Sequence, residues 1–187
     1  MKDKNRTEQA LLELGYTLDI EGMNEEAEQM YLKAIEMLED KTSNQDLEIL
    51  STTAFEHGKK LYNLKRYDQA LAAFKRSKEI LDSLVILDAN HLVIEKLANS
   101  ISWYARSLRK LNKFQRAANE YQRACSIWGA LRTFSPDTEK DSCYALKLGL
   151  NMYGLSKCLK SKNDYELADL AMYSAKSLLG NFNIAFE

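Results

Sequence analysis

The sequence predicts an all-α protein built from four antiparallel helix pairs. A pattern of small and large residues recurs four times along the chain. The 187 residues include only one proline and seven glycines, whereas sheet proteins need many tight turns. Apolar residues make up 45% of the chain and charged residues 28%, which is ordinary for a folded protein. We therefore expect one domain, residues 1–187, of long helices around a substantial core.

The recurring pattern places an alanine, a large residue four positions later and a second small residue three positions after that. The copies are Ala27, Tyr31 and Ala34; Ala70, Phe74 and Ser77; Ala117, Tyr121 and Ala124; and Ala168, Met172 and Ala175. This spacing keeps the three residues on one face of a helix. Each copy thus predicts the second helix of a pair.

A large residue followed by a small one stands on the segment before each copy, with the small residue twelve positions before the alanine. The pairs are Leu14 and Gly15, His57 and Gly58, Tyr104 and Ala105, and Leu155 and Ser156. Small residues on both helices allow close approach, and the large residue of the second helix fills the space beside them. These segments predict the first helix of each pair.

The expected pairs cover about residues 4–40, 46–87, 91–132 and 138–179, followed by a tail at 180–187. Ser43 and Asn90 are candidate helix caps, and Ser135 offers another cap, with Pro136 in the first turn. The four alanines lie 43, 47 and 51 residues apart. Because the intervening sequence stays apolar-periodic, we expect long helices rather than long linkers.

Together these features resemble the tetratricopeptide repeat (TPR), which couples a large-small pair on helix A to alanine, an aromatic residue and alanine on helix B. The resemblance covers most of the chain, although Met172 replaces the fourth aromatic residue and the usual tryptophan and proline are absent. The spacing exceeds the common 34 or so residues and is similar to that of kinesin light chains, spindle-orientation adaptors and bacterial peptide-sensing regulators. The resemblance implies a right-handed superhelical solenoid that acts as an adaptor, with the A helices lining its concave groove.

The large-small pair fixes which residues of each A helix would face that groove. The set is Leu12, Tyr16 and Asp19; Phe55, Lys59 and Tyr62; Ser102, Arg106, Arg109 and Lys110; and Tyr153, Lys157 and Lys160. One equivalent position holds Tyr16 and then three consecutive cations, Lys59, Arg106 and Lys157. Solvation of an exposed face would explain such cations without any ligand. We expect instead a basic trough with aromatic walls that binds an acidic, partly apolar peptide of another protein.

Two other ligand classes were weighed for the same groove. A basic stripe with aromatic residues could hold RNA or another nucleic acid, but the pI near 6.2 opposes this interpretation. So does an acidic first segment, since residues 1–50 hold 5 Lys and Arg against 13 Asp and Glu. The two-carboxylate clamp that binds heat-shock chaperone tails is absent. Its places hold Leu12, Tyr16, Glu56, Asn99 and Trp103.

The last helix carries a second apolar set beside its motif face. Its members are Leu167, Leu170, Ala171, Tyr173 and Leu178. Either the tail folds over this set through Phe182, Ile184 and Phe186, or another chain covers it. We therefore keep a third alternative, an assembly or regulatory subunit that docks or self-associates through this helix.

The remaining reactive residues do not indicate catalysis. Cys125, Cys143 and Cys158 lie in apolar helical contexts and are expected to be buried thiols without zinc spacing. His57 is expected in the core and His91 at an exposed helix start. No catalytic set, phosphate loop, metal site or cofactor motif appears, and neither a membrane span nor a secretory signal is found. The sequence thus predicts a cytoplasmic protein that is not an enzyme.

Overall fold

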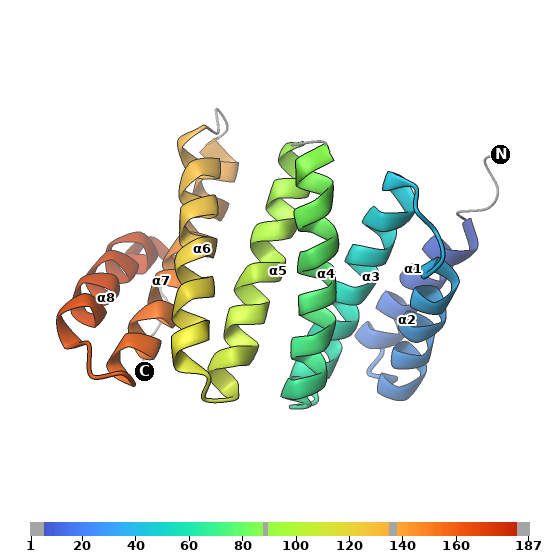
Figure 1. Ribbon diagram of the computed structural model, residues 1–187, viewed down its shortest axis with the longest axis horizontal. Helices are drawn as coiled ribbons and strands as arrows, with labels where there is room; N and C mark the ends of the chain where they lie inside the picture. Colours follow the sequence, from blue (N-terminus) through green and yellow to red (C-terminus); the bar gives the residue numbers. More distant parts are fainter. Residues whose placement is uncertain (1–5, 88–89, 135–137, 183–187) are drawn as a thin grey trace. The chain divides into compact units, whose positions relative to one another are not determined.

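The computed structural model describes residues 6–87, 90–134 and 138–182 (Figure 1). These residues form eight α-helices, a short 3-10 helix and no strand. The helices are α1 (Arg6–Ile20), α2 (Asn24–Leu38), α3 (Asn44–Asn63), α4 (Tyr67–Leu87), α5 (His91–Lys110), α6 (Phe114–Thr133), α7 (Thr138–Lys160), α8 (Tyr165–Leu179) and η1 (Gly180–Phe182). The predicted all-α fold of consecutive helix pairs is confirmed. None of the described helices is both long and apolar enough to cross a membrane.

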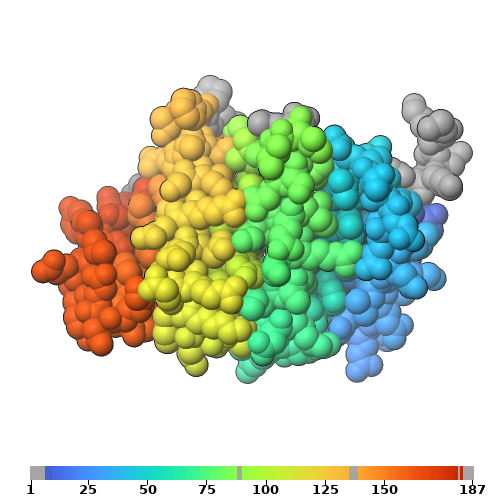
Figure 2. All heavy atoms as spheres, viewed as in Figure 1, coloured from blue at the N-terminus to red at the C-terminus, as the bar shows by residue number. Residues whose placement is uncertain are grey.

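The chain divides into two compact units, residues 1–100 and 101–187, with the boundary inside α5. In the first unit, α1 packs on α2 and α3 on α4. In the second unit, α7 packs on both α6 and α8. In the view that Figures 1 and 2 share, α4 lies partly in front of α3, and α6 lies partly in front of α7. The expectation of a single domain stays a prediction.

All four turns from a first to a second helix use the same backbone geometry. A residue with positive φ, in the left-handed region, stands five positions before each repeat alanine. These residues are Gly22, Lys65, Asn112 and Asn163, with φ between 58° and 80°. In the second turn the Arg66 amide donates to the Leu61 carbonyl at 2.9 Å, and the other three turns make the equivalent bond. This is the Schellman arrangement of a helix C-terminus, and it fixes the angle at which each second helix returns.

Close approach of the paired helices depends on glycine at two of the predicted small positions. A Cβ atom built on Gly15 would lie 2.6 Å from Cε1 of Tyr31. One built on Gly58 would lie 2.7 Å from Cε1 of Phe74. Carbon atoms in contact sit about 3.5–4.0 Å apart, so any larger residue would displace the ring. The predicted packing of the large residue over the small one is confirmed in these pairs.

In the second unit, glycines of α7 that the repeat pattern did not single out take a similar part. The Tyr121 ring of α6 lies on Gly154, where an added Cβ would meet its Cζ at 2.4 Å. Leu179 of α8 lies against Gly149. Further along α6 the ring centroids of Trp128 and Tyr144 are 5.7 Å apart. The core of this unit therefore depends on α7 as much as on the repeat alanines.

Two predicted helix caps are confirmed by hydrogen bonds. The Ser43 side chain accepts from the Asp46 amide at 3.2 Å, and the Asn90 side chain accepts from the Leu92 amide at 2.8 Å. The predicted cap at Ser135 and Pro136 falls outside the described residues.

Two expectations from the sequence are wrong. Leu14, the large residue before Gly15, carried no such expectation and is 45% exposed. Leu12, expected in the groove, is buried against Ala27 and Tyr31. Of the three cysteines expected to be buried, Cys158 is buried, Cys125 is half-buried and Cys143 is exposed near the start of α7. Burial raises the pKa of Cys125 to about 12 and that of Cys158 to about 11.

Candidate functional site

The predicted groove residues of the first unit begin with Tyr16 on α1. Its ring packs edge-on against Tyr31, with 6.2 Å between the centroids. Burial raises the pKa of Tyr16, and the negative charge of Glu56, which accepts its hydrogen bond, raises it further. Tyr16 therefore acts as a neutral donor that joins α1 to α3.

Lys59 carries a charge that the same helix balances. Its Nζ lies 2.8 Å from Oε2 of Glu56, one turn earlier on α3. The same Nζ is 5.7 Å from the centroid of the Phe55 ring. The Tyr62 ring packs on Tyr67 of α4, with 5.1 Å between the centroids. Tyr16, Phe55 and Lys59 thus form a charge-balanced aromatic cluster around Glu56, and Tyr62 packs separately on α4.

The other first-unit lysines near this cluster are paired as well. Lys60, which is buried, bonds to the Asp19 carboxylate and to the side chain of Asn24, so Asp19 is engaged in the turn between α1 and α2. Lys96 on α5 lies 3.2 Å from Glu48 on α3. Hence the first helices of this unit present acids and bases together.

Small hollows lie between the helices of the first unit. One of about 150 Å³ is lined by Ser51, Thr52, Phe55, Glu56, Ser77, Leu81, Lys96, Asn99 and Ser100. A wider hollow of about 450 Å³ lies between α2, α3 and α4, with His57 in its wall. His57 is packed as predicted, but its buried Nε2 stands 3.6 Å from Glu28 and has no hydrogen-bond partner among the described residues. Burial lowers the pKa of His57, against the opposing effect of Glu28.

In the second unit two predicted groove cations lie over aromatic rings. The Arg106 guanidinium carbon is 4.5 Å from the centroid of the Trp103 ring, one turn earlier on α5. Lys157 of α7 is 5.2 Å from the centroid of the Tyr153 ring. Such cation–ring pairs hold a charged group at a fixed place while leaving it hydrated on one side. Trp103 belongs to this surface although the groove prediction did not include it.

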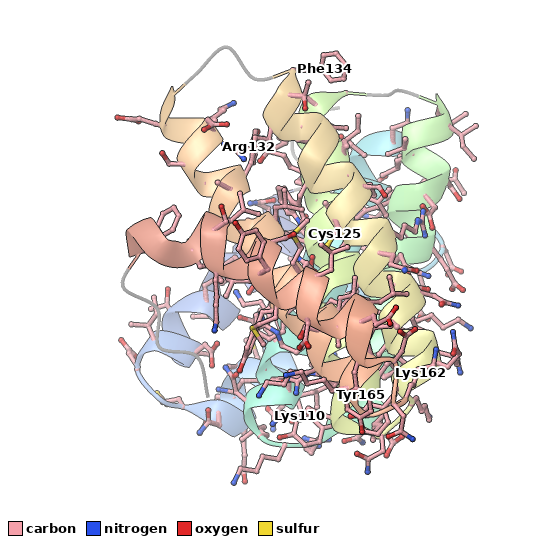
Figure 3. All side chains as sticks on the ribbon, turned by 90° about the vertical axis from the view of Figure 1, so that its left-hand side faces the viewer. Lys110, Cys125, Arg132, Phe134, Lys162 and Tyr165 are labelled. Carbon is pink, nitrogen blue, oxygen red and sulfur yellow. The ribbon has the colours of Figure 1, made fainter. Side chains whose placement is uncertain are left out.

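The other three predicted cations of this unit differ in burial. Lys110 is exposed at the end of α5, where Figure 3 labels it. Lys160 is exposed and lies 3.7 Å from Asp169 of α8. Arg109 is half-buried and hydrogen-bonds the buried Tyr121. Burial raises the pKa of Tyr121, and the Arg109 charge opposes that rise. Arg109 thus contributes charge from beneath the surface.

The first helices of the second unit hold an excess of positive charge. Residues 101–113, at the end of α5, contain four Lys and Arg and no Asp or Glu. Residues 142–163, along α7, contain four Lys and again no acid. The eight cations are Arg106, Arg109, Lys110, Lys113, Lys147, Lys157, Lys160 and Lys162. Counting charge in short stretches, rather than over the first 50 residues, would have found this from the sequence.

The predicted docking surface on α8 is exposed. Leu167, Leu170 and Tyr173 are 51%, 62% and 75% exposed, and Tyr165 is 58% exposed. Leu178, the fourth residue of the predicted docking surface, is half-buried and so less exposed than the other three. In Figure 3, α8 faces the viewer, with Tyr165 labelled at its first turn. Ile184 and Phe186, which could have covered this helix, lie outside the described residues.

Potential metal ligands do not gather in the described part of the chain, where no three His, Cys, Asp or Glu side chains are suitably placed. The arrangement is that of a helical-repeat protein: paired antiparallel helices, small residues at the crossings and identical turns.

Comparison with known proteins supports the predicted repeat type. Residues 8–40, the first of the four predicted units, match the tetratricopeptide repeat family, and the fold of the chain is similar to that of other helical-repeat proteins. The apo form of RapI has a similar fold, with a TM-score of 0.77 at 12% identity over 98% of this chain. BtubC (BKLC) from P. vanneervenii is also similar, with a TM-score of 0.52 at 17% identity over 99% of this chain and 85% of its own.

The chain spans 59% of the length of RapI, so the likeness concerns that part of RapI alone. A search of curated protein sequences finds no significant match.

Proposed function

We propose that the protein is a non-enzymatic adaptor that binds an acidic, partly apolar segment of another protein on the first helices of its second unit. TPR-type repeats generally mediate protein–protein interaction, which supports the class. A cytoplasmic location is part of this proposal and rests on the sequence. The observation that carries the choice of ligand is the cation excess of residues 101–113 and 142–163, which contain no acid.

Charge balance favours the second unit over the first. In the first unit Lys59, Lys60 and Lys96 each lie beside a carboxylate, so an incoming acid would have to displace an existing pair. In the second unit the guanidinium of Arg106 and the ammonium of Lys157 lie against aromatic rings, within segments that contain no acid. A cationic surface speeds the encounter with an acidic partner.

The aromatic rings give the proposed surface its second property. Trp103 and Tyr153 are half-buried beside the two cations, so part of each ring remains available to an apolar side chain. Aromatic residues and arginine are enriched among the residues that dominate binding energy at interfaces. Acidic residues flanking one or two apolar anchors therefore fit this surface better than an acidic segment alone.

The test is capture of partners from a native lysate, with and without nuclease. Wild type is compared with an Arg106→Glu, Lys157→Glu variant and with a control, Arg123→Glu on the exposed side of α6 combined with Lys75→Glu on α4. Arg109 is left unchanged because it bonds to the buried Tyr121 and its reversal would disturb the fold. The thermal melting curve of each variant verifies folding.

We expect a protein whose capture is unaffected by nuclease. It should be lost from the Arg106→Glu, Lys157→Glu variant and retained by the control. Recovery that depends on intact nucleic acid would replace the proposal with nucleic-acid binding, whose affinity falls steeply with salt. Partners that survive the double reversal would contradict the assignment of this surface.

A further inference from the structure

The exposed apolar residues of α8 lie on a side of the helix that is polar in the other second helices. Leu167, Leu170 and Tyr173 stand one position before, two after and five after the repeat alanine Ala168. At about 100° per residue they form a stripe opposite Ala168. We call these three residues the outer α8 face.

The equivalent positions of α2, α4 and α6 are all exposed and mostly polar. They hold Glu26, Gln29 and Leu32 on α2; Gln69, Ala72 and Lys75 on α4; and Arg116, Asn119 and Gln122 on α6. The large apolar outer face is therefore specific to α8 within the described helices.

A following helix pair would not cover this face. Where a first helix packs on the preceding second helix, the contacts come from positions four and eleven after the repeat alanine. In the second unit these are Tyr121 on Gly154 and Trp128 on Tyr144, and in the first unit Leu38 packs with Leu50. The outer α8 face uses different positions, so its partner lies beside the row of helices rather than continuing it.

We propose that a second copy of this chain covers the outer α8 face, with the two α8 helices packed antiparallel about a twofold axis at Leu170. In this arrangement Leu167 of one copy packs on the partner's Tyr173, and the contact is made twice. Such self-complementary contacts are typical of twofold dimers.

The charges of α8 favour the antiparallel direction. Asp164, Glu166 and Asp169 lie at its start and Lys176 near its end. Antiparallel pairing about Leu170 brings Lys176 of one copy to the same side of the contact as the partner's Glu166. Parallel pairing would place acids beside acids, and it would also align the two helix dipoles unfavourably.

The available area suits a weak dimer. A fully exposed large side chain offers roughly 200 Å², so the exposed fractions of Leu167, Leu170 and Tyr173 leave about 380 Å² per copy. The pair would then bury about 750 Å² through these side chains, less than the roughly 1,000 Å² of a stable specific interface. We expect dissociation in the micromolar range rather than an obligate dimer.

Sedimentation velocity on the full chain tests the pairing, between about 1 and about 500 µM, a range that spans the expected dissociation constant. Wild type should shift from monomer to dimer across this range. Leu170→Glu should remain monomeric, because it places two carboxylates at the axis. Asn119→Glu, the same charge at the equivalent position of α6, should behave like wild type.

A charge exchange tests the direction of the helices. Lys176→Glu should weaken the dimer about tenfold, and Glu166→Lys added to it should restore the original dissociation constant. The Arg106→Glu, Lys157→Glu variant should dimerise normally, which separates this inference from the proposed peptide surface. Wild type that stays monomeric throughout, or a dimer that persists in folded Leu170→Glu protein, would overturn the proposal.

Discussion

Replacement of Gly58 by alanine measures how tightly the second helix pair is packed. The new Cβ would lie 2.7 Å and 2.8 Å from Cε1 and Cδ1 of Phe74, whereas carbon atoms in contact prefer about 3.5–4.0 Å. Phe74 is fully buried and has no exposed space to move into. Overpacking of this kind costs about 1–3 kcal/mol, and the better helix propensity of alanine offsets about 1 kcal/mol. We expect a net loss of about 0–2 kcal/mol.

The assay is urea denaturation followed by circular dichroism, with Gly129→Ala as the matched control. Gly129 also lies within a helix, α6, but nothing stands within 4 Å of its added Cβ, so this change should stabilise by up to about 1 kcal/mol. Gly58→Ala should thus lie about 1–3 kcal/mol below the control. In the Gly58→Ala background, Phe74→Leu should cost less than it does in wild type. Equal stabilisation by the two alanines would refute the packing argument.

Three further results are expected. Lys65→Gly should raise the free energy of unfolding by about 1 kcal/mol in urea titrations, because Lys65 has a φ of 61° that costs a non-glycine residue about that much; no change would show that this turn is unstrained. As pH falls below 6.5, the ordinary pKa of histidine, the unfolded state takes up more protons than the folded state, since burial lowers the pKa of His57. Stability should therefore fall from pH 6.5 downward, with a smaller slope in His57→Gln, and an unchanged slope would contradict this origin. A thiol reagent should modify Cys143 rapidly in the native protein and the other two cysteines only slowly, because Cys143 alone among the three is exposed. Fast modification of a Cys143→Ser variant would disprove this assignment.

The fold followed from the sequence because the repeat records a steric requirement. Gly15 and Gly58 each contact an aromatic ring sixteen positions further along the chain. This fixed spacing is visible in the sequence alone. The four turns carry a comparable signal outside the repeat pattern. Gly22, Asn112 and Asn163 are residue types that favour left-handed geometry, whereas Lys65 adopts the same geometry without that preference.

The candidate site was less predictable because the balance of each charge depends on its neighbours, both on the same helix and on other helices. Lys59, Arg106 and Lys157 occupy equivalent positions in the sequence pattern. Glu56 stands one turn before Lys59 and neutralises it, while Trp103 takes the corresponding place before Arg106. The burial of Lys60 with Asp19 joins residues 41 apart and has no local signature.

Binding of a defined acidic peptide is the most direct test of the proposed peptide surface on the second unit. The probe is a fluorescein-labelled peptide of glutamates with one leucine and one phenylalanine, measured by anisotropy beside the same peptide with glutamine for glutamate. We expect the glutamate peptide to bind and the glutamine peptide not to bind. Arg106→Glu with Lys157→Glu should weaken the affinity at least about tenfold, and Arg123→Glu with Lys75→Glu should leave it unchanged. Equal affinity in the two variants, or equal binding of the two peptides, would contradict the proposal.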